Sequence, residues 1–256
     1  MTEPIVSLSG VRKAFSNGTL ALDGVDLTVR RGEFVSLLGP SGCGKSTALR
    51  LIAGLTRPSA GRVAWAGGTP NLGFVFQEPT LMPWRTVEAN VRLPLQVQGM
   101  SRAEAAPRIA DSLARVGLTG FEGSYPRQLS GGMKMRVSIA RALTTRPDIL
   151  LMDEPFAALD EITRARLNDD LLRLWEQQGL TIVFVTHSVY ESVYLSSRIV
   201  VMAPRPGRIV ADLAVESPTG RDDLYRTTAT YNRDCRVVSD ALKSAMSQPG
   251  GDMAHV

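Results

Sequence analysis

The chain has 256 residues and a formal net charge of +4, and 44% of its residues are hydrophobic, which is typical of a globular protein. No apolar run approaches the ~18 residues that a membrane-spanning helix needs, and Met1–Pro4 lack the features of a secretory signal. The two cysteines, Cys43 and Cys235, indicate a reducing compartment. The mild, scattered positive charge weakly suits an anionic membrane face or nucleic acid but better fits a solvated surface, so no nucleic-acid partner is expected.

Short β-branched or aromatic runs bounded by Gly or Pro predict strands in the first third of the chain. The runs are Ile5–Ser9, Val25–Val29, Phe34–Leu38, Arg62–Ala66 and Leu72–Phe76. A glycine-rich loop follows the third run and leads into a predicted helix over Lys45–Gly54, which Gly54 should end.

The pattern becomes helical from about Trp84. Ser101 and Glu104 have the spacing of a capping box, and Gly117 fits the end of a helix. Pro107 predicts a kink or a broken start in the same helix. The predicted helices are Val87–Val97, Arg102–Val116 and Gly131–Leu143.

The α/β alternation resumes at Asp148. Ile149–Met152 and Thr181–Thr186 are apolar runs typical of strands buried on both faces, and Glu161–Gln178 is the predicted helix between them. A last helix is expected over Leu224–Ala245. The pattern predicts an α/β domain at 1–220, with a core at 1–83 and 147–220, a helical subdomain at 84–146 and a short extension at 221–256.

The loop after Phe34–Leu38 has the pattern of a phosphate-binding loop, in the strand–loop–helix context that this motif requires. Its backbone N–H groups and the helix N-terminus would cradle phosphate oxygens. Lys45 would neutralise the β- and γ-phosphates, Ser46 would ligate Mg²⁺, and Thr47 would contact the α-phosphate side. The predicted nucleotide-binding residues here are Gly39, Pro40, Ser41, Gly42, Cys43, Gly44, Lys45, Ser46 and Thr47.

Other polar residues follow predicted strands. Asp153 and Glu154 end a buried strand, where two charges are costly unless a metal or a water uses them. Asp153 is predicted to hold Mg²⁺ indirectly, and Glu154 to act as the general base on the attacking water. His187 is predicted to contact the γ-phosphate, and Gln77 to reach Mg²⁺ or water. Taken singly, Asp153 and Glu154 also fit a solvated acidic turn. His187 alone also fits a core histidine, and Gln77 alone fits a surface glutamine.

Leu129–Met133 places Ser-Gly-Gly at the start of a predicted helix. Such a start provides an anion site lined by N–H groups, with a capping hydroxyl, although alone it also fits an ordinary capped helix. Together, this run and the motifs above make the chain resemble the nucleotide-binding subunits of ABC transporters from about Ile5 to Ala214. The resembling motifs are Gly39–Thr47 (Walker A), Gln77 (Q-loop), Leu129–Met133 (signature), Ile149–Glu154 (Walker B), Ala158–Asp160 (D-loop) and His187 (switch histidine).

The resemblance implies a RecA-like P-loop NTPase core with an antiparallel β-subdomain and an inserted α-helical subdomain. It implies an ATP-hydrolysing homodimer, in which the signature of one copy closes over the γ-phosphate bound by the partner's Lys45. Phe15 stands where the family often has a tyrosine that stacks on adenine. The further implied nucleotide contacts are Phe15, Ser130, Gly131, Gly132 and Asp160.

Two stretches, Phe76–Asn90 and Leu195–Arg208, are similar to ATPases of the nitrate/sulfonate/taurine import group. This similarity implies a peripheral subunit at the cytoplasmic face of the membrane that drives import of a small solute. Its partners would be a separate permease and, indirectly, an extracytoplasmic solute-binding protein. The alternative is a soluble ABC-type ATPase of iron–sulfur assembly or DNA maintenance. The short insert between Lys45 and Ser130 argues against the DNA-repair type, whereas size does not exclude the iron–sulfur type.

The apolar run Leu81–Trp84 directly follows the Gln77 loop. Two readings of this run stay open. It could line a groove that accepts a short helix of the permease, or Trp84 could pack inward as a core aromatic.

Overall fold

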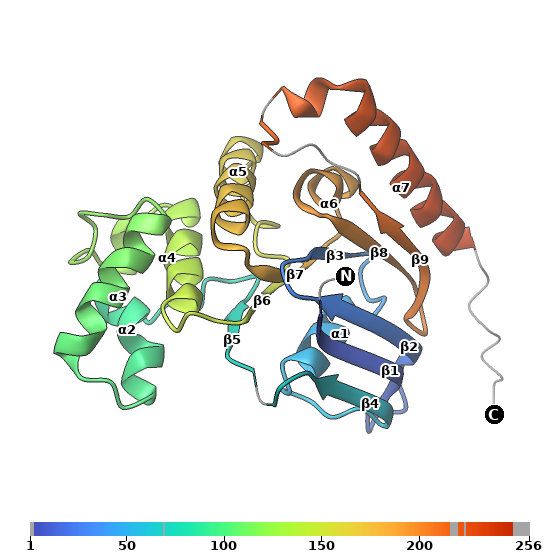
Figure 1. The fold of residues 1–256 in the computed structure, drawn as a ribbon, viewed down its shortest axis with the longest axis horizontal. Coiled ribbons are helices and arrows are strands. Elements are labelled where there is room, and N and C mark those ends of the chain that lie inside the picture. Colours follow the sequence, from blue (N-terminus) through green and yellow to red (C-terminus); the bar gives the residue numbers. More distant parts are fainter. Residues whose placement is uncertain (1–2, 69, 216–219, 223, 248–256) are drawn as a thin grey trace. The chain divides into compact units, whose positions relative to one another are not determined.

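The structure, a computed structural model, describes residues 3–68, 70–215, 220–222 and 224–247 (Figure 1). The chain divides into two compact units. Unit 1 comprises Met1–Thr69 with Thr181–Val256, and unit 2 comprises Pro70–Leu180. Across the described ranges, no helix is both long and apolar enough to cross a membrane.

Unit 1 contains parallel strands that lead to predicted site residues. The strand β3 (Phe34–Leu38) lies between β7 (Thr181–Thr186) and β8 (Arg198–Ala203), and all three are parallel. β9 (Arg208–Ala214) is antiparallel to β8. Every residue of β3 and β7 is buried, which matches their apolar sequences. The helices α1 (Lys45–Ile52) and α6 (Val189–Leu195) follow β3 and β7 in the chain.

A second, antiparallel sheet in unit 1 confirms the predicted β-subdomain. Its middle strand β1 (Pro4–Ala14) pairs with β2 (Leu20–Arg30) and β4 (Ala60–Trp65). β1 and β2 are longer than predicted because β1 continues through a register shift between Leu8 and Val11. Gly10 lies within this irregularity at φ 56°, a backbone conformation that glycine adopts without strain.

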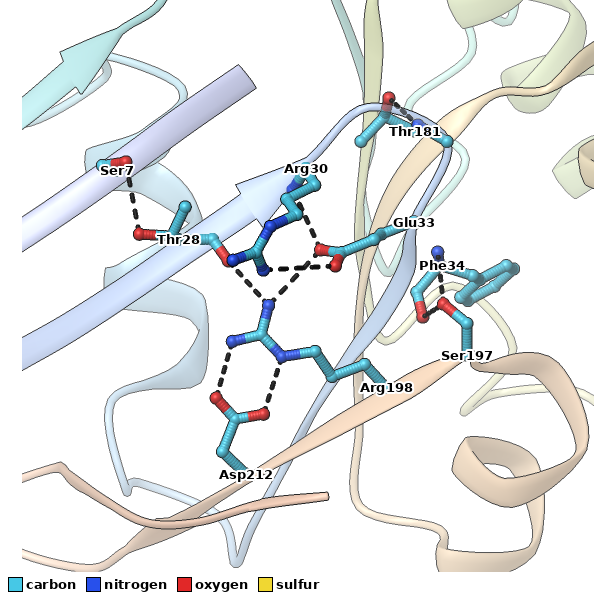
Figure 2. Close-up of polar contacts among 10 residues, drawn as sticks. Ser7, Thr28, Arg30, Glu33, Phe34, Thr181, Ser197, Arg198 and Asp212 are labelled. Carbon is cyan, nitrogen blue, oxygen red and sulfur yellow. Dashed lines mark hydrogen bonds and ion pairs between the residues drawn. The ribbon is translucent and has the colours of Figure 1, made fainter. Parts of the chain in front are cut away.

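A polar network connects the two sheets of unit 1 (Figure 2). Arg198 of β8 donates two hydrogen bonds of 2.6 Å to the Asp212 carboxylate on β9. The same guanidinium donates to the Thr28 carbonyl of β2 at 2.7 Å and lies 3.3 Å from Glu33. The bonds to Asp212, opposed by burial, raise the pKa of Arg198. One mostly buried cation therefore ties β2 to the β8–β9 pair.

Unit 2 pairs β5 (Leu72–Val75) with β6 (Ile149–Asp153) in parallel and contains four longer helices. The predicted capping box at Ser101 is present, and Gly117 follows the helix with φ 67°. The helix containing Pro107 is continuous from Arg102, so the predicted broken start is wrong. Pro107 lies in the second turn, where its missing N–H removes only one bond of the helix. The helices are α2 (Val87–Val97), α3 (Arg102–Arg115), α4 (Gly131–Leu143) and α5 (Glu161–Gln178).

The C-terminal helix α7 (Ala229–Ser247) starts later than the predicted Leu224. Tyr225–Thr227 instead form a 3₁₀ turn, and the Thr228 hydroxyl accepts from the Tyr231 N–H at 3.1 Å. The helix thus begins where a threonine can cap it. The sequence pattern predicts no element at β8, α6 or β9, although the apolar run Ile199–Met202 is typical of a strand.

Candidate nucleotide-binding site

Unit 1 provides the phosphate-binding loop, which connects buried β3 to α1. Gly44 has φ 95°, and a Cβ there would lie 2.6 Å from Leu22 Cδ2 and 2.8 Å from the Ala21 carbonyl. A Cβ at Gly39 would lie 2.7 Å from both the Cys43 Sγ and the Met202 carbonyl oxygen. Side chains are therefore excluded at both ends of the loop, so its backbone can follow a tight path around an anion.

Lys45 opens α1 and points its ammonium group back into the loop. Its Nζ donates to the Gly39 carbonyl at 2.7 Å and to the Pro40 carbonyl at 3.0 Å, and the residue is only 4% exposed. This position suits neutralisation of a phosphate held by the loop N–H groups. Burial raises the pKa of the neighbouring Cys43 thiol, against the opposing charge of Lys45.

His187 directly follows β7, and this position lies beside the phosphate-binding loop. Leu38, the last residue of β3, is in register with Thr186, the last residue of the parallel strand β7. Gly39 and His187 thus follow adjacent strands at one edge, where open α/β sheets bind ligands. His187 is exposed, so the reading as a core histidine is wrong.

In unit 2, the predicted acids and Gln77 also lie at the carboxyl ends of two adjacent parallel strands. Val75 of β5 is in register with Met152 of β6, so exposed Gln77 and Asp153 follow adjacent parallel strands at one edge. Asp153 is 9% exposed, and partly buried Glu154 has φ 44°. A non-glycine residue in this left-handed region costs about 1–3 kcal/mol, and such strain gathers at functional positions.

The signature and the D-loop lie at the starts of two helices in unit 2. Ser130 caps α4 by accepting from the Met133 N–H at 3.3 Å, and Asp160 caps α5 by accepting from the Thr163 N–H at 2.9 Å. A Cβ on Gly132 would lie 2.5 Å from Thr163 Cγ2, so glycine allows the two helix starts to approach closely. Ser130 and Gly131 are exposed and accessible to a phosphate.

Two residues that were not predicted hold the loop after Gln77. Arg141 of α4 donates to the Thr80 carbonyl and to the Thr80 hydroxyl, both at 2.8 Å, and to the Pro79 carbonyl at 2.9 Å. Wholly buried Asn90 of α2 donates to the Met82 carbonyl at 3.2 Å and accepts from its N–H at 2.8 Å. An arginine or asparagine within a helical pattern carries no signal for such contacts.

The aromatic candidates lie at the surface. Phe15, in the turn between β1 and β2, is 43% exposed, and Lys13 Nζ lies 5.1 Å from its ring centroid. The exposed part of the ring is accessible to a base. Trp84 is 73% exposed, so its reading as an inward-packing core aromatic is wrong.

Comparison with known proteins identifies the family. The family model described as "ABC transporter" matches residues 22–157, more than half of the chain. This chain belongs to the ABC transporter family. The Aliphatic sulfonates import ATP-binding protein SsuB 1 of Pseudomonas savastanoi pv. phaseolicola (strain 1448A / Race 6) is 46% identical over 224 residues, 87% of this chain and 90% of the relative.

Solved ABC cassettes have the same fold. One is the dimeric post-hydrolysis state of the ATP-binding cassette MJ0796 bound to ADP and Pi, with 35% identity and a TM-score of 0.72 over 84% of this chain and 100% of that one. Another is cbiO1 from Clostridium perfringens, part of the transporter complex cbiONQ, with 25% identity and a TM-score of 0.77 over 93% and 99%. The predicted RecA-like ABC fold is confirmed. The chain binds ATP and is an ATPase coupled to transport.

Proposed function

We propose that this ATPase works as a homodimer beneath a separate membrane permease and drives import of aliphatic sulfonates or a similar small solute, such as nitrate or taurine. The observation that carries this proposal is the likeness to importer subunits along most of the chain. Relatives that are 46% and 48% identical to it are named as aliphatic sulfonates import ATP-binding proteins. Transport would place the subunit at the cytoplasmic face of the membrane, with an extracytoplasmic binding protein delivering the solute.

The proposed chemistry assigns distinct roles to the residues at the carboxyl ends of the strand pairs β3–β7 and β5–β6. Lys45 and the loop N–H groups bind and neutralise the β- and γ-phosphates. Glu154 accepts a proton from the attacking water, and His187 holds the γ-phosphate and orients that water. Gln77 senses the γ-phosphate region. Positioning and charge neutralisation carry most of the catalysis in phosphoryl transfer, so small displacements of these groups matter.

Mg²⁺ is part of this proposal. The donors assigned to it are the Ser46 hydroxyl, the Gln77 amide oxygen and, indirectly, the Asp153 carboxylate, which are the hard oxygen ligands that Mg²⁺ prefers. Asp153 is 9% exposed at the end of β6, and its carboxylate is assigned to Mg²⁺ through a water. When bound, Mg²⁺ would neutralise phosphate charge.

The homodimer follows from the way the motifs are divided. Each chain has one phosphate-binding loop and one signature. We assign Ser130, Gly131 and Gly132 to the nucleotide held by the partner's Lys45, with Asp160 beside them and Phe15 on the adenine. The dimeric state of the MJ0796 cassette supports this assignment. We retain the domain limits 1–220 and 221–256 as part of the proposal.

Trp84 is proposed to contact the permease. Its 73% exposure leaves a large apolar surface directly after the loop that carries Gln77. Trp84→Ala should change the stability of the isolated subunit by less than about 0.5 kcal/mol, as exposed sites usually do. A buried interface tryptophan is worth about 2 kcal/mol, so affinity for the permease should fall about 30-fold. Thermal melts and co-purification measure the two effects.

The matched control is Val97→Ala, because Val97 ends α2 and is 80% exposed. This variant should retain both stability and permease binding. Equal co-purification of Trp84→Ala and wild type would remove the proposed contact.

The import function is tested by uptake of a radiolabelled aliphatic sulfonate into cells that carry this chain and its permease. Uptake should be present with the wild type and absent with Lys45→Ala, which cannot neutralise the phosphates. Parallel assays with nitrate and taurine identify the solute. Sulfonate uptake that persists in Lys45→Ala cells would refute the role in import, whereas ATP-dependent uptake of nitrate alone would refute only the preference for sulfonate.

A further inference from the structure

The C-terminal segment of unit 1 holds α6, the short helix that begins two residues after His187. Figure 1 shows α7 close to α6, and the two helices are in contact. The Tyr231 hydroxyl of α7 donates to the Tyr190 carbonyl in the first turn of α6 at 3.0 Å. Arg221 donates to the Tyr194 carbonyl and, at 3.0 Å, to the Ser196 carbonyl. Side chains after residue 220 therefore hold both ends of α6.

Aromatic packing adds to the contacts between α6 and the residues that follow Arg221. Tyr194 of α6 is wholly buried, and the Arg226 guanidinium lies 3.5 Å from the centroid of its ring. The Tyr225 ring lies 6.4 Å from that of Tyr194 and 5.3 Å from that of Tyr231. Burial raises the pKa of Tyr231, so its hydroxyl remains a donor at neutral pH. A shift of α6 would disrupt hydrogen bonds and ring contacts together.

Through Glu191, α6 is also bonded to the residues that flank His187. The Thr186 hydroxyl donates to the Glu191 carboxylate of α6 at 2.6 Å and accepts from the Ser188 N–H at 3.0 Å. The Ser188 hydroxyl accepts from the Glu191 N–H at 3.2 Å. Glu191 thus connects α6 to the chain on both sides of His187, so a displacement of α6 would move the histidine.

We propose that Arg221 and α7 form a positioning element for His187, and that Tyr231 and Arg221 are its positioning residues. The inference rests on the proposed function, which gives His187 its contact with the γ-phosphate. A helix of seven residues is not stable alone and takes its position from tertiary contacts. Since a misplacement of about 1 Å can reduce catalysis about 100-fold, a segment remote from the phosphates can determine turnover.

Histidine NMR tests the positioning directly. The chain has two histidines, His187 and His255, so ¹⁵N-histidine labelling gives two sets of imidazole signals, which the His255→Ala variant assigns. Tyr231→Phe and Arg221→Gln should shift the His187 signals. They should lower kcat for ATP about threefold and about tenfold, respectively, with KM unchanged, because the groups that bind the nucleotide are untouched. Arg221→Lys keeps a cationic donor and should recover part of the loss.

Two comparisons separate positioning from a general loss of stability. Ala245→Gly weakens α7 at a buried position away from its first turns, and it should leave the His187 signals and kcat unchanged. In a His187→Gln background, Tyr231→Phe and Arg221→Gln should cause no further loss of kcat. Unshifted His187 signals, or an equal loss of kcat in both backgrounds, would overturn the inference. A His187→Gln variant with wild-type turnover would instead overturn the catalytic role of His187 in the proposed function.

Discussion

Glu154→Gln is expected to lower kcat for ATP hydrolysis by ~10²–10⁴-fold, the usual contribution of a general base, while ATP affinity stays close to that of the wild type. The loss corresponds to roughly 3–5 kcal/mol of activation free energy. Glutamine preserves the shape of the side chain but cannot accept the proton of the attacking water. Glutamine meets the same steric cost as glutamate at the left-handed φ of 44°, so the turn after β6 should not change. The variant should accumulate as an ATP-bound dimer.

Single-turnover kinetics with purified protein measure this effect. The matched control is Glu161→Gln, an exposed acid in the first turn of α5 to which no chemistry is assigned. The control should hydrolyse ATP at nearly the wild-type rate. Near-wild-type turnover of Glu154→Gln would place the base on another residue.

Ser130→Arg is expected to abolish hydrolysis while the isolated subunit still binds ATP. Lys45 and Ser46 come from the same chain as the bound nucleotide, whereas Ser130 is assigned to the nucleotide of the partner subunit. Exposed Ser130 has room for an arginine in the monomer, and loss of its cap should cost about 1 kcal/mol. Ser101→Arg removes an equivalent cap from α3 and should keep hydrolysis, which separates loss of a cap from loss of the site.

A comparison with Lys45→Ala tests the assignment of Ser130 to the partner's nucleotide. Lys45→Ala should lose ATP binding, whereas Ser130→Arg should keep it. Mixing the two variants forms heterodimers with one complete site and one site that lacks both groups, so part of the hydrolysis should return. If ATP binding falls as severely in Ser130→Arg as in Lys45→Ala, the serine acts within its own chain.

Local sequence rules predicted those parts of the fold that depend on local physics. The strand–loop–helix at Lys45, the capping box at Ser101 and the glycine after α3 each need only a few adjacent residues, and all are present. The end of β1 and the start of α7 were misplaced. A bulge beside Gly10 lets β1 continue further than predicted, and a cap at Thr228 makes α7 begin later. Neither feature changes the hydrophobic pattern, so the pattern could not show them.

The candidate site was predictable where chemistry requires a residue type at a fixed spacing. Such spacing predicts Lys45, Asp153 and Glu154 as site residues, and the parallel pairing of β3 with β7 places His187 beside the loop of Lys45. Long-range contacts could not be predicted. Arg141 holds Thr80 across 61 positions of sequence, and Tyr231 holds Tyr190 across 41. An arginine or tyrosine on an amphipathic helix does not reveal which carbonyl it will bind.

The most direct test of a site shared between two copies is the dependence of specific ATPase activity on protein concentration. Below the dissociation constant of the dimer, specific activity should rise in proportion to concentration, because only the dimer contains a complete site. Sedimentation velocity at the same concentrations gives the fraction of dimer, and activity should follow it. Constant specific activity at concentrations where the protein is monomeric would show that one chain hydrolyses ATP alone and would contradict the shared site.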